Sequence, residues 1–210
     1  MKATVNQIFT TLAITITNPT TELHYNSNFE LLIAVLLSAR TTDKTVNKAT
    51  TKLFKIADTP AKMSALGDNG IKKYIKSIGL YNTKAANINK TCKILQEKFN
   101  SQIPTTREDL EQLPGIGRKT ANVILNIAFS QPTIAVDTHV FRVARRLDLA
   151  QGNTPQKIEA QLVKIIPKKF AKIAGNLLLL HGRYVCTAKN PKCQLCKLNK
   201  VCAHKKKERV

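Results

Sequence analysis

The amino-acid sequence predicts an all-α protein, and three observations support that prediction. Apolar residues recur at spacings of three and four along most of the 210 residues, which is the pattern of a helix with one buried face. No stretch alternates between apolar and polar residues for long enough to form a strand. Proline and glycine residues interrupt the apolar stretches, at 60, 67–70, 79, 104, 114–117, 132, 152–155 and 167.

The first expected helix lies close to the N-terminus. The apolar residues between Val5 and Ile16 fit one helix face, and this Thr-rich segment follows a single early lysine, so it indicates a surface helix rather than a signal peptide. Cys92 lies on a later apolar stripe, which predicts a buried core thiol rather than a ligand. No apolar run approaches the roughly 18 residues that would span a bilayer. The six further stripes lie at 29–37, 71–78, 88–99, 123–128, 140–147 and 158–166.

The charge of the chain is strongly positive and unevenly distributed. Lysine and arginine number 34 against 13 acidic residues, a net charge of +21. Residues 1–43 carry a net charge of −1, so residues 44–210 carry +22, and the run Lys205–Arg209 is typical of a solvated tail. Such an excess favours a polyanionic partner, either nucleic acid or an acidic membrane surface, over the alternative of a lysine-rich proteome. Aromatic residues at 5% and no tryptophan argue against a platform that stacks single-stranded bases.

Four of the five cysteines lie near the C-terminus. Cys186, Cys193, Cys196 and Cys202 have the spacing C-x6-C-x2-C-x5-C. Four soft thiolates in a short segment predict a zinc site or an iron–sulfur cluster. Disulfides suit small secreted domains, and this chain is larger and has no export signal, which predicts a cytoplasmic protein. Structural zinc sites often pair two C-x2-C units, so the irregular spacing slightly favours a [4Fe–4S] cluster.

A second motif lies between two expected helices, at Leu113-Pro114-Gly115-Ile116-Gly117-Arg118-Lys119-Thr120-Ala121. Proline and the two glycines permit a tight turn, and the isoleucine between them can fill the core. Backbone N–H groups of the turn and of the following helix can then face a phosphate. The segment resembles the helix–hairpin–helix motif, which grips the DNA backbone without reading sequence. Gly115, Ile116, Gly117 and Arg118 are the expected contacts, and by itself Lys119 would also be a phosphate contact.

A carboxylate follows eighteen residues after Lys119, in the segment Val136-Asp137-Thr138-His139. Asp137 precedes an expected helix, so one interpretation is an N-cap that accepts backbone N–H bonds. The apolar approach and the basic helix after it also suit a charge at the edge of a pocket. Both interpretations hold together, because a capped carboxylate stays ionised and rigid.

These three features occur in the same order and spacing in endonuclease III, a family of DNA glycosylases that are also apurinic/apyrimidinic lyases. The resemblance extends to residues 19–23, 29–39, 78–82 and 181–184. It implies two helical domains that flank a DNA-binding cleft. One is a bundle at 21–132 with the helix–hairpin–helix at about 107–130. The other combines 1–20 with 133–210 around a [4Fe–4S] cluster, for which the ligands would be Cys186, Cys193, Cys196 and Cys202.

The resemblance also implies the chemistry. Lys119 matches the family's nucleophile and Asp137 its essential carboxylate. A lysine amine attacks only when unprotonated, and Arg118 and the start of a helix both disfavour the ammonium form. Attack at C1′ of the sugar expels an oxidised pyrimidine and leaves a Schiff base, and β-elimination then cleaves the strand 3′ to the abasic site. Asp137 would stabilise the cationic sugar. The target nucleotide must first leave the duplex.

Further DNA contacts are implied residue by residue. Leu80 matches the position of a wedge that fills the hole left by the extruded nucleotide. Arg40 stands where the family usually has glutamine, and it can offer only donors to the unpaired base. An alternative role for Arg40 is to complement a helix C-terminus. Lys189 and Lys192 would form a basic loop on the DNA backbone. The implied partner is double-stranded DNA with oxidised pyrimidines or abasic sites, bound by a monomer associated with the nucleoid and not with a membrane.

Three other classes of protein compete with this reading. A helix–hairpin–helix protein that only binds DNA around a structural metal would form no covalent intermediate and would leave Asp137 without a role. Adenine-mismatch and thymine-mismatch glycosylases of the same superfamily lack the lysine that this chain has as Lys119. An iron–sulfur electron carrier needs neither the hairpin nor a charge of +21.

Overall fold

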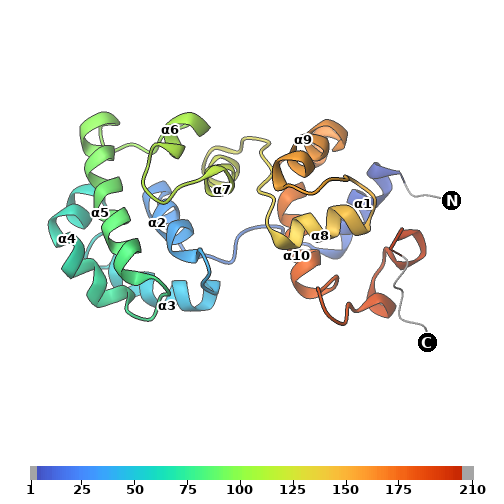
Figure 1. The fold of residues 1–210 in the computed structure, drawn as a ribbon, viewed down its shortest axis with the longest axis horizontal. Helices are drawn as coiled ribbons and strands as arrows, with labels where there is room; N and C mark the ends of the chain where they lie inside the picture. The colour runs from blue at the N-terminus through green and yellow to red at the C-terminus, as the bar shows by residue number, and fades with distance from the viewer. Residues whose placement is uncertain (1–3, 205–210) are drawn as a thin grey trace. The chain divides into compact units, whose positions relative to one another are not determined.

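The computed structural model describes residues 4–204, so the predicted tail at Lys205–Arg209 lies outside the described residues. The described residues are helical without any strand, and the all-α prediction is confirmed (Figure 1). No helix among them is long and apolar enough to cross a membrane. The α-helices are α1 Val5–Thr15, α2 Asn28–Ser38, α3 Asp43–Phe54, α4 Pro60–Ile75, α5 Tyr81–Lys98, α6 Arg107–Glu111, α7 Arg118–Phe129, α8 Thr138–Arg146, α9 Pro155–Ile165 and α10 Ala174–Tyr184. Short 3-10 helices lie at Lys168–Phe170, Cys193–Leu195 and Asn199–Val201.

Side-chain caps explain where many of these helices begin. A serine, threonine or aspartate stands at the N-cap and accepts a hydrogen bond from a backbone N–H of the first turn, which satisfies a donor that has no partner inside the helix. At α1 the bond is reciprocal, because the Gln7 side chain accepts from the N–H of Thr4 at 2.8 Å. The capping residues are Thr4, Ser27, Thr42, Thr59, Thr106, Asp137 and Thr154.

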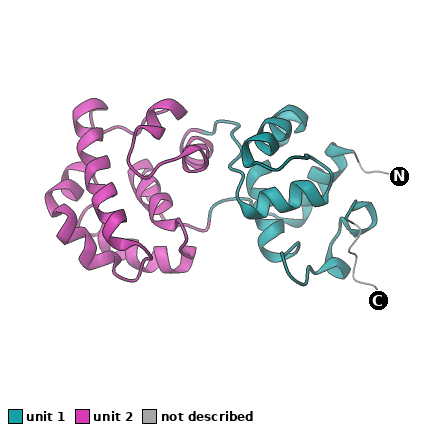
Figure 2. Ribbon diagram, viewed as in Figure 1, with its two compact units in different colours: residues 1–21, 130–210 teal, residues 22–129 magenta. Residues whose placement is uncertain are grey.

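The chain divides into two compact units (Figure 2). Residues 22–129 form one, which we call the bundle unit. The segments before residue 22 and after residue 129 together form the other, which we call the termini unit.

The bundle unit is built around α2. Every residue of α2 from Phe29 to Leu37 is buried, and the helix contacts α3, α5 and α7. A helix that is apolar on all sides needs such cover on all sides. The helix α4 is interrupted within the glycines at 67–70, as the sequence predicts. Gly67 adopts φ +60°, which kinks the helix, and the chain continues helically to Ile75.

The termini unit has its own core. Its helices α8 and α10 are packed together, and α1 from the start of the chain contacts α10. Gly182 permits the close approach of α8 and α10, since a Cβ there would lie 2.9 Å from the Cβ of His139. Phe9 of α1 stacks on Phe170 with 5.8 Å between ring centroids. The cysteines Cys186, Cys196 and Cys202 are partly buried against this core.

Candidate catalytic and DNA-contacting residues

The hairpin of the bundle unit joins α6 to α7. Gly115 has φ +84°, and a Cβ at this position would lie 2.8 Å from Asn87 Nδ2 on α5, so only glycine fits without strain. Ile116 is buried, as the sequence predicts, and its N–H donates to the carbonyl of Leu113 at 3.0 Å. Gly115 and Gly117 are exposed on either side of it. The turn therefore has an anchored centre and an accessible backbone.

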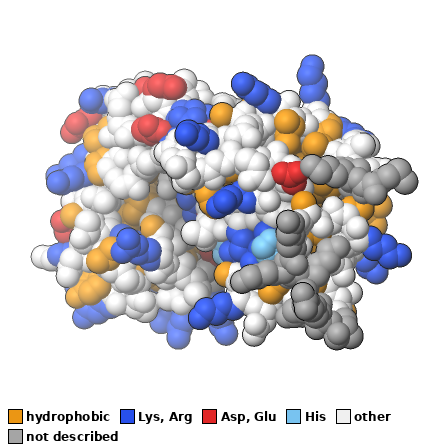
Figure 3. Space-filling model, turned by 45° about the vertical axis from the view of Figure 1, so that its right-hand side comes forward, with side chains coloured by type: hydrophobic (Ala, Val, Ile, Leu, Met, Phe, Trp, Pro, Cys, Tyr) orange, Lys and Arg blue, Asp and Glu red, His pale blue; other side chains and the backbone are white. Residues whose placement is uncertain are grey.

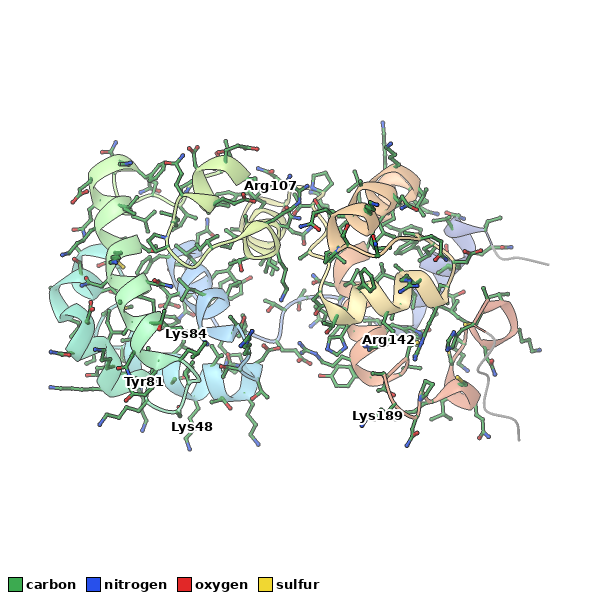
Figure 4. The ribbon with its side chains drawn as sticks, in the orientation of Figure 1. Lys48, Tyr81, Lys84, Arg107, Arg142 and Lys189 are labelled. Carbon is green, nitrogen blue, oxygen red and sulfur yellow. The ribbon has the colours of Figure 1, made fainter. Side chains whose placement is uncertain are left out.

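Lys119 is the second residue of α7 and its side chain is exposed, as is that of Arg118. The helix is held in place by two buried residues, Ile124 and Asn122, and only 1% of Asn122 is exposed. Asn122 Oδ1 accepts a hydrogen bond from Arg107 Nε of α6 at 3.0 Å, which ties the two helices of the hairpin together (Figure 4). A primary amine thus projects from a rigid helix start directly after the turn.

Leu80 and Arg40, the two expected wedge residues, share an unusual backbone. Leu80 has φ +60° and Arg40 has φ +56°, a left-handed conformation that a residue with a side chain adopts at a cost of about 1–2 kcal/mol. Both are exposed, Leu80 to 63%. A large apolar side chain held in solvent on strained backbone is typical of a functional position.

The C-terminus of α2, which the alternative role for Arg40 concerns, is hydrogen-bonded by another basic residue. Lys84 Nζ on α5 donates to the carbonyls of Leu37 and Ala39, at 2.8 Å and 2.6 Å. This contact could not be predicted from the sequence, because a lysine on a helix is ordinarily exposed at the surface.

Asp137 lies in the termini unit and caps α8, which confirms the N-cap interpretation. Its Oδ1 accepts from the N–H groups of His139 and Val140, at 2.9 Å and 2.8 Å. The preceding Val136 is buried, so the carboxylate directly follows an apolar segment that is anchored in the core. Because both bonds end on Oδ1, Oδ2 is the oxygen that can face another group.

The four clustered cysteines line one cavity in the termini unit, and none of them forms a disulfide. Burial raises the pKa of Cys196, a hydrogen bond with the Leu198 backbone lowers it, and the neighbouring thiols of Cys186, Cys202 and Cys193 raise it further. As they stand, no three histidine, cysteine or acidic side chains within residues 4–204 are arranged to hold a single metal ion. Four soft donors around a shared cavity fit a [4Fe–4S] cluster, in which each thiolate binds a different iron.

Two arginines that the sequence analysis did not single out hold the cysteine segment to α8. Arg142 Nε donates to the carbonyl of Cys186 at 2.9 Å, and Arg142 Nη2 donates to the carbonyl of Gly182 at 2.8 Å. One turn later, Arg146 Nη1 donates to the carbonyl of Thr187 at 2.7 Å. The spacing of four places both arginines on one face of the helix that Asp137 caps. The only signal in the sequence was the basic character of this helix.

Lys189 and Lys192 lie in the loop between the first two of these cysteines, and both are exposed (Figure 4). Thr187 braces the loop from within, because its hydroxyl donates to the carbonyls of Lys189 and Asn190 at 2.7 Å and 3.0 Å. On the face of the molecule in Figure 3, many lysine and arginine side chains and few acidic ones are visible, in line with the net charge of +21.

Comparison with known proteins shows the family to which the chain belongs. Residues 33–168 match the HhH-GPD superfamily of base excision DNA repair proteins. Endonuclease III of Escherichia coli K12 is 53% identical over 206 residues, which cover 98% of each chain. Endonuclease III of Haemophilus influenzae is 56% identical over 190 residues, 90% of each chain. A solved structure described as a trapped endonuclease III–DNA covalent intermediate superposes with a TM-score of 0.89 at 42% identity, covering 96% of both chains. The chain therefore belongs to the endonuclease III family of DNA glycosylases and apurinic/apyrimidinic lyases, within the HhH-GPD superfamily of base excision repair.

Proposed function

We propose that this protein removes oxidised pyrimidines from duplex DNA through a Schiff base on Lys119 and then cleaves the strand 3′ to the abasic site by β-elimination. The observation that carries the proposal is the exposed amine of Lys119 in the first turn of α7, directly after the hairpin turn. The family membership of the chain supports the same role.

The reaction follows from this amine. The lone pair of Lys119 Nζ attacks C1′, the bond from C1′ to the base breaks, and the base leaves with that electron pair and takes up a proton. Ring opening gives an iminium between Nζ and C1′, which acidifies the 2′ proton. Loss of that proton expels the 3′ phosphate, and the strand is cleaved by β-elimination. Water finally releases the sugar fragment from the lysine.

Asp137 would act on the same sugar as a fixed negative charge. Its two backbone hydrogen bonds, of 2.9 Å and 2.8 Å, orient the carboxylate before the substrate arrives. A preorganised charge stabilises a cationic transition state without having to reorient during the reaction. The same carboxylate can accept the protons that the reaction moves.

DNA binding would combine several segments. The backbone of Gly115, Ile116 and Gly117 together with Arg118 would hold phosphates, and Lys189 and Lys192 would hold others. Leu80 and Arg40 would fill the space of the extruded nucleotide. Cys186, Cys193, Cys196 and Cys202 would hold a [4Fe–4S] cluster, which supplies a cross-link that shapes the basic loop. Because one chain carries all these residues, we infer that it acts as a monomer, on the DNA of the nucleoid in the cytoplasm.

The test is borohydride reduction during reaction with a duplex that contains one oxidised pyrimidine. Reduction of the Schiff base gives a stable protein–DNA adduct, and we expect Lys119→Gln to abolish it while duplex binding is largely kept. Lys93→Gln is the matched control, because Lys93 is an exposed lysine on α5 away from the hairpin turn. An adduct that persists in Lys119→Gln would assign the attack to another amine. No adduct with the unaltered protein would favour the binding-only alternative.

Salt dependence tests the DNA contacts separately. If the +22 on residues 44–210 meets phosphates, affinity for undamaged duplex must fall steeply between ~50 and ~200 mM salt, since each neutralised phosphate releases counterion. A nearly flat double-logarithmic plot would mean that most of this charge never contacts DNA.

A further inference from the structure

Lys84 is a buried lysine in the bundle unit. Only 6% of it is exposed, although lysine is among the residues least often buried. Its Nζ donates to the carbonyl of Leu37 at 2.8 Å, to the carbonyl of Ala39 at 2.6 Å and to Thr41 Oγ1 at 3.3 Å. An ammonium group has three protons, so all its donors have partners. The buried charge is therefore fully hydrogen-bonded by the last turn of α2 and the loop that follows it.

The position of these acceptors links Lys84 to both wedge residues. Ala39 and Thr41 stand immediately before and after Arg40, so the ammonium group holds the backbone and side chain on either side of it. The backbone N–H of Lys84 donates to the carbonyl of Leu80 at 3.0 Å, which closes the first turn of α5. One residue thus contacts the Leu80 segment through its main chain and the Arg40 segment through its side chain (Figure 4).

We propose that Lys84 is a positioning residue that fixes Leu80 and Arg40 relative to each other, so that both enter the duplex as one rigid pair when the damaged nucleotide is extruded. This inference rests on the proposed function and deepens it.

The backbone conformations support the proposal. Arg40 and Leu80 both have positive φ, at +56° and +60°, and such strained residues persist only where their surroundings over-determine them. The carbonyls at the end of α2 have no partner inside the helix, and a cation there is favoured by the helix dipole. Lys84 supplies that cation from a residue 45 positions away from Ala39, and in doing so it fixes the loop that bears Arg40.

The same helix also supports the hairpin. Asn87 packs so close to Gly115 that a Cβ at that glycine would collide with it. Thr91 Oγ1 donates to the carbonyl of Pro114 at 3.4 Å. Residues 84, 87 and 91 lie at spacings of three and four, which places them on one side of α5. The helix α5 therefore follows directly after Leu80, and one of its faces contacts both the hairpin and the Arg40 loop. If Lys84 only stabilised its own surroundings, this arrangement would not be required.

The experiment compares two substrates that differ in the cost of extrusion. One duplex carries a base-paired oxidised pyrimidine, and the other carries a preformed abasic site, which has no base to unpair. Lys84→Met keeps the apolar stem and removes the charge and the donors. We expect single-turnover base release from the first duplex to fall by roughly tenfold or more, because unpairing and unstacking cost a few kcal/mol that the wedge pair must offset. Strand cleavage of the second duplex should fall less than about threefold, since its extrusion costs least.

Two control variants and one further test variant keep this result specific. Lys93→Met removes an exposed lysine from the same helix and should leave both rates unchanged. Ile71→Val perturbs the buried core on α4 and shows what a loss of stability alone does to both rates at a matched fall in melting temperature. Thr41→Val replaces the hydroxyl beside Arg40 by a methyl group and so removes its bonds to Lys84 and to the carbonyl of Ala39. It should repeat the substrate difference more weakly, and it tests the proposal even if Lys84→Met fails to fold.

A fluorescent adenine analogue opposite the damaged pyrimidine adds a readout without chemistry. With the unaltered protein its emission should rise as the wedge pair unstacks it, and with Lys84→Met that rise should be reduced. Equal losses on both duplexes, in Lys84→Met or in Thr41→Val, with a normal fluorescence change would overturn the proposal and leave Lys84 a structural residue. Failure of the unaltered protein on both duplexes would instead count against the proposed function.

Discussion

The two units hold the segments that we propose to contact DNA by different means. In the bundle unit, the hairpin and the wedge loops rest on a continuous apolar core and on the buried ammonium group of Lys84. In the termini unit, Arg142 and Arg146 hold the basic loop by donating hydrogen bonds to its backbone carbonyls. Its cysteines lie at the edge of the core. The loops of the bundle unit therefore rest on its own core, whereas we expect the cysteine segment to depend on a further cross-link.

Burial explains this difference. Leu198 is the only buried residue between 186 and 204, and the 3-10 helices at Cys193–Leu195 and Asn199–Val201 have no buried residue of their own. By contrast, all nine residues from Phe29 to Leu37 in α2 are buried. A segment that buries so little apolar surface cannot offset the entropy of ordering its backbone. Ligation by four thiolates would supply the stabilising free energy that this segment does not obtain from burial in the core.

The largest expected effect follows from removing that ligation. Cys196→Ala, or removal of iron, should unfold residues 186–204 while the bundle unit stays intact, since structural metal sites such as zinc fingers supply on the order of 10 kcal/mol. Amide hydrogen exchange resolved along the chain would show protection lost in that segment and kept in α2 and α5. The unaltered protein should absorb broadly near ~400 nm and contain about four irons. Colourless protein with one zinc and full activity would contradict the cluster.

Asp137 provides the second test, because it belongs to the termini unit but is held by two backbone hydrogen bonds and not by the cysteine segment. Asn caps a helix about as well as Asp, so Asp137→Asn should leave the melting temperature almost unchanged. If the charge stabilises the cationic sugar, base release should fall by ~100-fold or more, the scale of losing one preorganised electrostatic partner. Single-turnover kinetics and thermal melts of the unaltered protein and of Asp137→Asn distinguish a catalytic charge from a helix cap. Equal rates would reduce Asp137 to a cap.

The sequence predicted the helices that carry a clear apolar stripe. The stripes at 29–37, 88–99 and 140–147 correspond to α2, α5 and α8. The helix α10 was not identified, because its run Leu177–Leu180 is apolar on consecutive positions and so shows no helical period. The expected break at Gly67 is present as a kink, where one residue with positive φ interrupts the helical backbone of α4.

The candidate site was predictable where a motif is local. Ile116 and the Asp137 cap follow from residues within a few positions of each other. Lys84 could not be found in this way, because its acceptors lie 43 to 47 positions earlier in the chain. The same holds for Arg142, which meets the carbonyls of Gly182 and Cys186 forty residues or more away. Side chains that bind distant backbone leave no periodic signal.

A third, smaller effect is expected at the contact of α8 with α10. Gly182→Ala would place a Cβ 2.9 Å from the Cβ of His139 and 3.0 Å from Val143 Cγ2, so the helices must separate. Overpacking of this kind costs about 1–3 kcal/mol. Gly175→Ala on the same helix is the matched control, because its nearest contact would be an ordinary 3.8 Å, and it should be neutral or slightly stabilising. Denaturant melts of both variants measure the difference. A neutral Gly182→Ala would show that α8 and α10 can move apart freely.

The smallest expected effect separates the two kinds of cysteine. Cys92 is completely buried in α5, and burial raises the pKa of its thiol from 9.0 to about 12. Because the thiolate is the reactive form, its fraction at pH 8 falls by about a thousandfold relative to an unshifted thiol. Native protein treated with an alkylating reagent at pH 8 should therefore keep Cys92 unmodified, as mass spectrometry of the digested chain would show.

After removal of iron, the same reagent should modify Cys186, Cys193, Cys196 and Cys202 while Cys92 stays protected, because the bundle unit does not depend on the cluster. Denaturant should expose Cys92 at the concentration at which the bundle unit unfolds. If Cys92 reacted as soon as iron was removed, the two units would unfold together. The cysteine segment would then support the core that carries Lys84, and the independence of the bundle unit would be wrong.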